Sequence, residues 1–383
     1  MKSDSPPPSP LVLGIESSCD DTACAVLDGS GSVLSSVVSS QLAAHRPYGG
    51  VVPEIASREH LRNWPSVRSQ ALELAGVELQ DIDVVAATRG PGLVGSLLVG
   101  LSLGKGLAFG RGLPFYGVHH LEGHLVSPYL ALPGEGAAED VPERFVGLVV
   151  SGGHTALYDV APEGTRTLGE TRDDAMGECF DKIGKRLGLP FPGGPLVDRL
   201  AERADVDRRG RVALSSGEAL LYRTPRCGDT LDFSYSGLKT QAQVDIEKLE
   251  KEHDAAVGGG ALAAALEREG SLSSEAPPVA DAASLLGAVR HAAVRQLVDR
   301  LERRYRDVPF QRLAVSGGVA ANRLLRREVV AWGERRGVDV RLVPLVYCGD
   351  NAAMIAHAAL RRHLRGAGSD SFETDAVSRL PVG

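Results

Sequence analysis

Two histidines four residues apart suggest a metal site in the first third of the chain. His120 and His124 lie in the stretch Gly-Val-His-His-Leu-Glu-Gly-His-Leu, residues 117–125. If this stretch begins a helix, both imidazoles point from one face and can bind one metal ion. With 10 histidines in 383 residues, such a pair arises by chance in roughly a quarter of sequences, so the pair alone is a weak signal.

A third ligand has to come from a distant part of the chain. The candidate is Asp350, in Tyr-Cys-Gly-Asp-Asn-Ala-Ala-Met, residues 347–354. Two imidazoles and one carboxylate form an open three-ligand site of the kind that binds catalytic metals. We therefore predict that His120, His124 and Asp350 meet in the folded chain.

The stretch Ser151-Gly152-Gly153-His154-Thr155 is the candidate phosphate site. Glycines between two strands let backbone N–H groups converge on an anion, and hydroxyls add donors. A purely structural hairpin is the alternative interpretation. The turn at residues 17–22 matches it in character, so two hairpins could hold a nucleotide phosphate between them.

Other polar residues could contact a nucleoside. The candidate carboxylates are Asp173, Asp174, Asp181 and Asp198; for any single one, a helix cap or a surface charge is the more common role. A carboxylate at such a position can accept hydrogen bonds from ribose hydroxyls. Gly317, Gly318 and Asn322 could approach an adenine ring or its ribose closely, because glycine leaves room for a flat ring.

The elements that must position these residues belong to a globular protein of two domains. The chain has 383 residues, 43% of them hydrophobic, which is enough for two cores. Its net charge of −7 argues against a surface covered in nucleic-acid contacts but leaves room for a local basic patch. The apolar stretch 93–109 contains Lys105 and several glycines, which favours a buried helix over a membrane span.

The cysteines and the N-terminus indicate the compartment. The five cysteines are Cys19, Cys24, Cys179, Cys227 and Cys348. An odd number without a Cys-x-x-Cys pair suits reduced thiols in a cytosol, so we expect no structural disulfide. Residues 1–10 resemble neither a secretory signal nor a transit peptide.

Two segments follow the same plan of apolar strand, small-residue turn and returning strand: residues 11–28 and residues 145–160. This weak internal repeat predicts two similarly folded halves. Between them we expect a strand at 83–88, a helix at 93–109 and a strand at 114–118, hence a largely parallel, helix-covered sheet. A further strand and glycine turn at 313–323 should lead into a helix.

The segment 247–282 changes character. It contains a charged run, a glycine run and a Ser/Pro-rich run, which together predict a surface insertion. From Asp281 a helical period resumes, with Leu285, Val289, Ala293 and Leu297 on one stripe. We expect residues 1–10 and 366–383 to be flexible tails.

A series of short motifs occurs in order between residues 11 and 360: Gly14-Ile-Glu-Ser-Ser-Cys-Asp-Asp-Thr22, Tyr48-Gly-Gly-Val-Val-Pro-Glu-Ile-Ala-Ser-Arg58, Gly90-Pro-Gly-Leu-Val-Gly95, Val118-His-His-Leu-Glu-Gly-His124, Val150-Ser-Gly-Gly-His-Thr155, Gly177-Glu-Cys-Phe-Asp-Lys182, Pro192-Gly-Gly-Pro195, Phe233-Ser-Tyr-Ser-Gly-Leu-Lys239 and Ser316-Gly-Gly-Val-Ala-Ala-Asn322. Together they resemble the tRNA threonylcarbamoyladenosine transferase family of the bacterial TsaD type, within the actin-like ATPase and sugar-kinase superfamily.

The resemblance implies an α/β fold of two similar actin-like (ASKHA) domains, at 11–143 and 144–365. Each would be a mixed sheet flanked by helices, with the active site in the cleft between them. The implied activity is metal-dependent transfer of the threonylcarbamoyl group from threonylcarbamoyl-AMP to N6 of the adenosine next to the anticodon. That adenosine is position 37 of tRNAs reading A-starting codons, and the product is t6A.

The resemblance also assigns roles to individual residues. His120, His124 and Asp350 would hold one divalent ion per subunit, Fe2+ with Zn2+ as the alternative. The other substrate contacts would be Val149, Val150, Ser151, Gly152 and Gly153 around the phosphate and acyl group, and Asp181, Gly194, Asp198 and Asn322 around the nucleoside. By its position in the first hairpin, Asp20 is the candidate for the proton-handling or orienting carboxylate, although a structural role in the turn is equally open.

The implied partners are threonylcarbamoyl-AMP, tRNA, a shorter TsaB-like paralogue and a TsaE-like ATPase, with a TsaC-type synthase supplying the donor. No membrane is involved. The expected compartment is the bacterial cytoplasm, with a mitochondrion or plastid as the alternative.

Two other functions fit parts of the sequence. A metalloprotease of the His-x-x-x-His type is one, but Glu122 lies one place later than the general base of a His-Glu-x-x-His helix. A non-catalytic nucleotide-binding scaffold is the other, although it would have no need of His120, His124 and Asp350 together. The sequence also departs from the family pattern at Cys348 and Ala353, where a threonine and a glycine are more usual.

Overall fold

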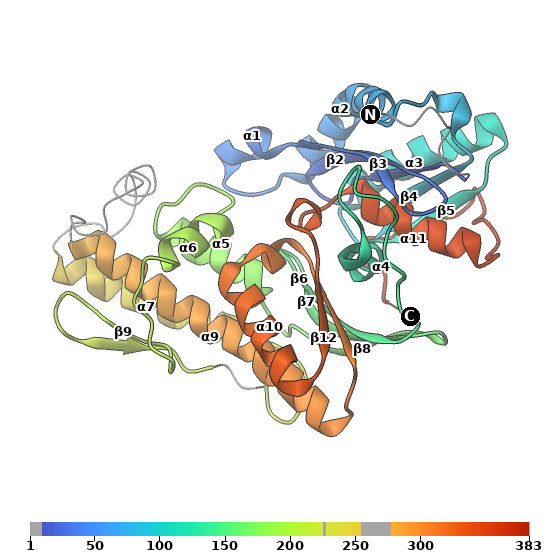
Figure 1. Ribbon diagram of the computed structural model, residues 1–383. Coiled ribbons are helices and arrows are strands. Elements are labelled where there is room, and N and C mark those ends of the chain that lie inside the picture. Colours follow the sequence, from blue (N-terminus) through green and yellow to red (C-terminus); the bar gives the residue numbers. More distant parts are fainter. Residues whose placement is uncertain (1–9, 225–226, 254–276, 383) are drawn as a thin grey trace.

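The structure, a computed structural model, describes residues 10–224, 227–253 and 277–382. Its frame is two five-stranded sheets, each packed against helices (Figure 1). None of the helices in the described ranges is long and apolar enough to cross a membrane. The most apolar of them, α3 (Val94–Arg111), instead packs on the first sheet, as the sequence predicts.

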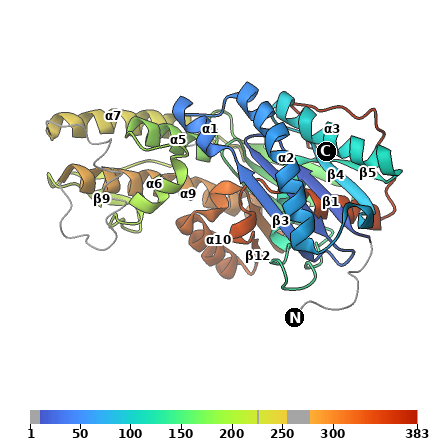
Figure 2. The ribbon, with the colours of Figure 1, turned by 90° about the horizontal axis from the view of Figure 1, so that it is seen from above.

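The first sheet has the strand order β3, β2, β1, β4, β5. Its strands are β1 (Val12–Glu16), β2 (Asp21–Leu27), β3 (Val33–Ser40), β4 (Val84–Gly90) and β5 (Phe115–His119). β2 is antiparallel to β1 and β3, whereas β1, β4 and β5 are parallel. All five residues of β1 are buried, because α2 (Pro53–Ala75) and α3 cover one face of the sheet (Figure 2) and α11 (Ala352–Leu364) covers the other (Figure 1).

Small residues let α3 approach the sheet. A side chain at Gly104 would lie 3.0 Å from the Cβ atom of Ala87 and 3.1 Å from the ring of Phe115. A side chain at Gly100 would collide with Ser17. The two glycines therefore place the helix directly over the strands that carry the first hairpin.

The second sheet repeats the first. Its order is β12, β11, β6, β7, β8, and its strands are β6 (Phe145–Val150), β7 (Thr155–Ala161), β8 (Gly164–Glu170), β11 (Arg312–Ser316) and β12 (Asp339–Leu342). Antiparallel β6, β7 and β8 and parallel β6, β11 and β12 occur as in the first sheet. The internal repeat predicted from residues 11–28 and 145–160 is confirmed.

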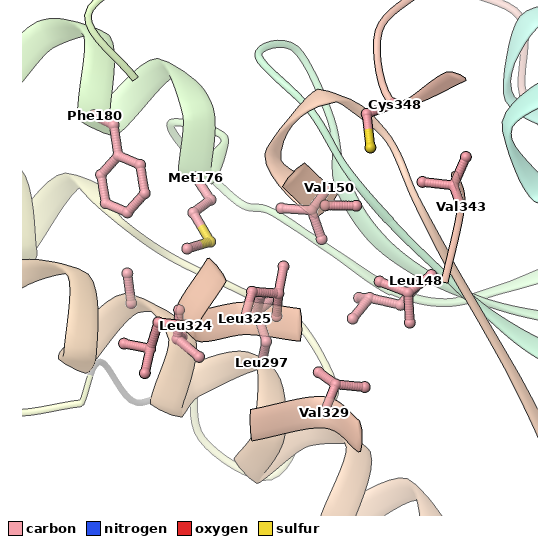
Figure 3. Close-up of a cluster of buried hydrophobic side chains, with 14 of the residues drawn as sticks. Leu148, Val150, Met176, Phe180, Leu297, Leu324, Leu325, Val329, Val343 and Cys348 are labelled. Atoms are coloured by element: carbon pink, nitrogen blue, oxygen red, sulfur yellow. The ribbon is translucent and has the colours of Figure 1, made fainter. Parts of the chain in front are cut away.

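The remaining helices are α1 (Leu42–His45), α4 (His120–Val126), α5 (Met176–Arg186), α6 (Gly194–Ala201), α7 (Ser236–Glu252), α9 (Pro277–Asp307) and α10 (Arg323–Arg336). Short strands β9 (Arg211–Ala213) and β10 (Ala219–Leu221) form a separate hairpin. Figure 3 shows the core of the second domain, where side chains of β6 meet those of α5, α9 and α10.

Helix α4 lies between the two sheets. Its Leu121 and Leu125 pack with Phe145 and Val149 of the second sheet, while Gly123 lets it approach Met354 and Ile355 of α11. α11 in turn packs on β1 of the first sheet, where a side chain at Gly14 would collide with Ala352. The C-terminal helix, which falls within the predicted second domain (144–365), therefore packs on the first sheet.

The segment after α11, which the sequence predicts to be a flexible tail, runs back across the first domain. Asp370 accepts a hydrogen bond from the amide of Gly117 and pairs with Arg362. Further along, Val377 N–H donates to the carbonyl of Arg89, and Ser378 accepts from Gly92. We call residues 370–382 the C-terminal strap; it is ordered because the exposed edge of β5 and the β4–α3 loop supply its hydrogen-bond partners.

The predicted surface insertion at 247–282 is helical at both of its ends. Residues 247–252 are the last turns of α7, and 277–282 are the first turns of α9. Leu249 and Val279 are buried in the main core, so the charged run is the solvent-facing side of an amphipathic helix. The middle of the predicted insertion, 254–276, lies outside the described residues.

Candidate active site in the interdomain cleft

A cavity of about 740 Å3 lies between the two domains. Its walls are the first hairpin (18–20), the loops at 49–51 and 91–93, the start of α4, the hairpin at 151–154, one face of α5, residues 191 and 193, Gly318, and residues 349–350. These segments come from both sheets and from nearly the whole length of the chain. The cavity lies at the ends of β1 and β6, where ligands bind in α/β folds.

The three predicted metal ligands meet at one end of this cavity. The Nε2 atoms of His120 and His124 lie 3.4 and 3.3 Å from Oδ1 of Asp350, and all three ligand atoms lie within 4.8 Å of one another. The histidines are one turn apart on α4, and Asp350 precedes α11. Asn351 caps α11 by accepting from Met354 N–H, at 2.9 Å, which fixes the backbone beside the carboxylate.

The residues fit a divalent cation. Both ring nitrogens of His124 are buried and have no hydrogen-bond partner among the described residues, although Nε2 lies close to the Asp350 carboxylate. A buried polar atom without a partner is costly, and a cation between the three side chains would satisfy it. Cys348, the departure from the family pattern, is buried with its thiol toward the carbonyl of Pro344 and leaves the trio intact.

Glu16 orients the first of these histidines. Its Oε2 atom lies 3.0 Å from Nδ1 of His120 and accepts from the hydroxyl of Thr88 at 2.7 Å. With Nδ1–H donated to Glu16, the Nε2 lone pair of His120 faces Asp350 and can coordinate a metal. Glu16 was not among the predicted site residues; a lone carboxylate at the end of a buried apolar strand is the feature of the sequence that could have indicated it.

The charges around His120, His124 and Asp350 favour the binding of one cation. Burial disfavours an imidazolium at His120, but Asp350 and Glu16 outweigh burial and raise the pKa of His120 well above its usual range. Burial also opposes ionisation of Asp350, yet His120 and His124 hold its pKa well below the usual range. The buried carboxylate of Glu16 and the partly exposed one of Asp350 thus attract a cation to this point, either a proton or a metal ion.

The glycine hairpin at 151–154 forms the opposite wall. Ser151 N–H donates to the carbonyl of His154 at 2.7 Å, and the Ser151 hydroxyl accepts from His154 N–H. The N–H groups of Gly152 and Gly153 donate to no other described residue, and side chains at either position would meet open space. Neither glycine has a positive φ, so glycine is needed here for access to the cavity and not for backbone strain.

Helix α5 begins against this hairpin. Gly177 N–H donates to the carbonyl of Ser151, and a side chain at Gly177 would lie 2.9 Å from the Cα atom of Gly152. The partial positive charge of a helix N-terminus therefore faces the hairpin. One face of α5 lines the cavity with Glu178, Asp181, Lys182 and Lys185.

Lys185 is a site residue that sequence reasoning missed. Lys182 pairs with Asp174 and Glu178, which raise its pKa, whereas Lys185 makes no ion pair with a described residue. Helical spacing could have indicated Lys185 from the sequence. Positions 178, 181, 182 and 185 share the helix face opposite the buried residues Cys179, Phe180 and Ile183. His154, which belongs to the predicted phosphate hairpin, also lines the cavity; burial lowers its pKa to about 4, so its ring is neutral near pH 7.

The predicted nucleoside contacts divide into two groups. Asp181 lines the cavity and accepts from Gly194 N–H at 2.7 Å; burial raises its pKa against that bond. Asp198 and Asn322 do not line the cavity. They bond to each other at 2.6 Å, and Asp198 pairs with the buried Arg290, so their side chains connect α6, α9 and α10.

The other predicted residues lie close to the cavity. Asp20 lines it, in a hairpin held by His60, which contacts both the Thr22 hydroxyl and the carbonyl of Cys19. Val149 and Val150 are buried on opposite faces of β6, so only their backbone could face a ligand. A positive φ at Gly317 and its closeness to the Val150 carbonyl exclude a larger residue there.

Glu122 points away from the histidines. It lines a different cavity together with Arg361 and Arg365, because it lies two residues after His120 on the helix. A carboxylate there cannot activate a water held by His120 and His124. The protease interpretation therefore lacks its general base.

Comparison with known proteins identifies relatives over nearly the whole chain. A family model described as "TsaD: tRNA N6-adenosine threonylcarbamoyltransferase" matches residues 32–357. A protein of Syntrophus aciditrophicus named tRNA N6-adenosine threonylcarbamoyltransferase is 43% identical over 375 residues, 97% of this chain and 98% of that protein. One of the same name from Burkholderia pseudomallei is 46% identical over 356 residues, 93% of both chains.

Solved structures show the same fold. The HypF protein of T. kodakarensis matches with a TM-score of 0.55 at 14% identity, over 93% of this chain and 48% of that one. At this identity the likeness concerns the fold alone. Together with the repeated sheet topology, it confirms the predicted α/β fold of two actin-like domains.

Proposed function

The chain belongs to the tRNA N6-adenosine threonylcarbamoyltransferase family, and we propose that its cleft transfers the threonylcarbamoyl group from threonylcarbamoyl-AMP to N6 of adenosine 37 in tRNAs reading A-starting codons, giving t6A. The observation that carries the proposal is the placement of His120, His124 and Asp350 across one cavity from the glycine hairpin. A scaffold without catalytic function would need only the hairpin.

The hairpin side of the cleft suits the donor's phosphate. The N–H groups of Gly152 and Gly153, the N-terminus of α5 and the ammonium group of Lys185 all favour an anion there. Asp181, on the same wall, could accept from a ribose hydroxyl. AMP, the leaving group, would thus be held where its developing negative charge is stabilised.

In the transfer, the N6 nitrogen attacks the carbamoyl carbon, the bond from that carbon to the phosphate oxygen breaks, AMP leaves, and N6 loses one proton. Asp20 lines the same cavity as His120 and is the proposed acceptor of that proton. The cleft contributes mainly by holding the amine and the anhydride in contact.

His120, His124 and Asp350 are the residues that would hold a metal, with Glu16 fixing the His120 ring. A bound divalent ion would supply Lewis-acid polarisation of the carbonyl or phosphate oxygen. Two imidazoles and one carboxylate with open positions suit Fe2+, and Zn2+ also accepts such a set. We propose Fe2+, with Zn2+ as the alternative.

We further propose a TsaB-like paralogue and a TsaE-like ATPase as partners, and a TsaC-type synthase as the source of threonylcarbamoyl-AMP. The support is the family membership. A cytosolic location is proposed because all five cysteines are free thiols, which a reducing compartment preserves.

The test combines purified protein, threonylcarbamoyl-AMP and unmodified tRNA, with and without the partner proteins, followed by nucleoside analysis of the tRNA. We expect t6A at position 37 and its loss in the His124→Ala variant. Equal t6A formation by His124→Ala would contradict the assignment of the cleft, and no t6A under any combination would contradict the proposed reaction.

A further inference from the structure

A second cavity, of about 900 Å3, lies outside the cleft, between the β9–β10 hairpin and α9. Six arginines line it: Arg208, Arg209, Arg223, Arg295, Arg300 and Arg303. The single carboxylate in its lining is Asp299. We call it the arginine groove. On a chain with a net charge of −7, it is a local concentration of positive charge.

Little of this charge is neutralised by the protein. Arg208, Arg209 and Arg223 are exposed and make no ion pair with a described residue. Arg303 pairs with Asp229, whose side chain is fully exposed, and Arg295 pairs with Asp299 at 3.3 Å on the helix surface. Six arginines against these two carboxylates leave four positive charges in excess, so the groove retains a positive potential.

Arg300 forms the buried part of the groove. It is only 7% exposed; its Nε–H donates to the backbone carbonyl of Asp232 at 2.9 Å, and its Nη2 has no hydrogen-bond partner among the described residues. No described carboxylate lies within ion-pair distance of it. A guanidinium group cannot lose its proton, so this is a buried, uncompensated charge, which is costly unless an anion binds there.

Helix α6 lies between the cleft and an intermediate cavity that adjoins the groove. Gly193, just before α6, lines the cleft, and Glu202, just after it, lines an intermediate cavity. The eight residues of α6 span about 12 Å. The intermediate cavity shares Arg208, His291, Arg295 and Asp299 with the groove, so these two cavities adjoin.

We propose that the arginine groove binds the phosphate backbone of the tRNA whose adenosine enters the cleft. The inference rests on the proposed function for the identity of the RNA. One guanidinium group can bind two phosphate oxygens at once. Proteins recognise RNA helices mainly through contacts to phosphates and 2′-hydroxyl groups. The cleft would then bind the base of adenosine 37, while the groove binds the phosphate backbone of another part of the same tRNA.

The first test is charge reversal. The variant Arg208→Glu/Arg209→Glu/Arg223→Glu should bind fluorescently labelled, unmodified tRNA at least tenfold more weakly by anisotropy. The slope of log affinity against log salt should fall by about two to three, since each phosphate contact contributes about 0.7 to 0.9. Affinity for AMP, measured by calorimetry, should not change, because the cleft is untouched.

The matched control is Arg62→Glu/Arg144→Glu/Arg166→Glu, which makes the same charge change at exposed arginines elsewhere. It should bind tRNA within about twofold of wild type, as expected for surface charges outside the contact. An equal loss in both variants would show a nonspecific charge effect and would overturn the groove assignment.

The second test is Arg300→Gln. It should weaken tRNA binding while leaving the thermal midpoint unchanged or higher, because it removes an uncompensated buried charge. If Arg300 only stabilised the fold, the variant would instead have a lower thermal midpoint and bind tRNA normally. Binding of inorganic phosphate that depends on Arg300, combined with unchanged tRNA affinity, would indicate a small-anion site and overturn the RNA assignment.

The outcomes separate the two proposals. Wild-type protein that binds tRNA through the groove but forms no t6A would contradict the proposed reaction alone. Wild-type protein that forms t6A while the triple Glu variant binds tRNA normally would contradict the groove alone.

Discussion

The Nδ1 atom of His120 lies 3.0 Å from Oε2 of Glu16, a residue 104 positions earlier in the chain. Glu16 ends the central strand of the first sheet and is fully buried, while His120 begins α4 between the two sheets. The contact therefore ties the geometry of the proposed metal site to the core of the first domain.

Glu16→Gln should weaken metal binding by about tenfold to a hundredfold while the protein stays folded. A glutamine amide can donate to Nδ1 of His120, which would put the proton on Nε2 and remove the lone pair that faces Asp350. Metal affinity is measured by competition with a chelator. Thr88→Val removes only the hydroxyl bond to Glu16 and serves as the milder control; equal losses in both variants would contradict the tautomer argument.

Metal affinity should rise with pH. Burial disfavours charge at His120, but Asp350 and Glu16 raise its pKa well above the usual range, so below that pKa a proton occupies the ring that must be neutral to bind metal. Apparent affinity should increase about tenfold per pH unit up to that pKa and then level off. In Glu16→Gln one of the two carboxylates is lost, so the plateau should begin at lower pH. A flat profile in wild type would show that His120 is not a ligand.

Gly152→Val should reduce AMP affinity at least tenfold, about 1.4 kcal/mol. The side chain would project into the cavity, where a glycine at 152 leaves open space. Because the site is open and φ is not positive, the variant should keep its thermal midpoint and its metal. Calorimetry with AMP is the measurement.

Its control is Gly110→Val, the same change at another open position, in α3. That variant should bind AMP normally. Unchanged AMP affinity in Gly152→Val would mean that the phosphate lies elsewhere, most simply against the first hairpin.

Ending the chain at Asp375 should lower both the thermal midpoint and metal affinity. The truncation removes the strap's bonds from Val377 N–H to Arg89 and from Gly92 N–H to Ser378, and the carbonyl of Leu380, which accepts from Nε2–H of His119 at 3.0 Å. Three such bonds contribute about 3 kcal/mol in total. His119 also caps α4 by accepting from Leu121 N–H, so the strap reaches the helix that carries both histidine ligands.

His119→Asn separates the two effects, since asparagine can still cap α4 but cannot reach Leu380. It should weaken metal binding in the full-length protein and have no further effect in the truncated one. Additive losses, read from melting curves and chelator competition, would show that the strap does not act through His119.

The sequence by itself determined the individual strands and helices, and the part of the site whose residues lie close together in the chain. Apolar runs placed β1, β4, β5, β6 and β11, and the repeat of strand, turn and strand predicted two sheets of one plan, because these patterns reflect burial within a few residues. The spacing of His120 and His124 placed both on one turn of α4 for the same reason. Asp350 was a candidate third ligand by residue type, but no spacing could connect it to the two histidines.

The tertiary structure decided which distant residues meet. Glu16 reaches His120, and the strap reaches His119, through packing of segments far apart in the chain, and no local pattern records that. Asp198 and Asn322 have the residue types of nucleoside contacts, but α9 supplies Arg290 and joins them in a network outside the cavity. The arginine groove shows the same limit: Arg208, Arg223 and Arg300 are ordinary surface charges in the sequence, and only the packing of the β9–β10 hairpin against α9 puts them together around one cavity.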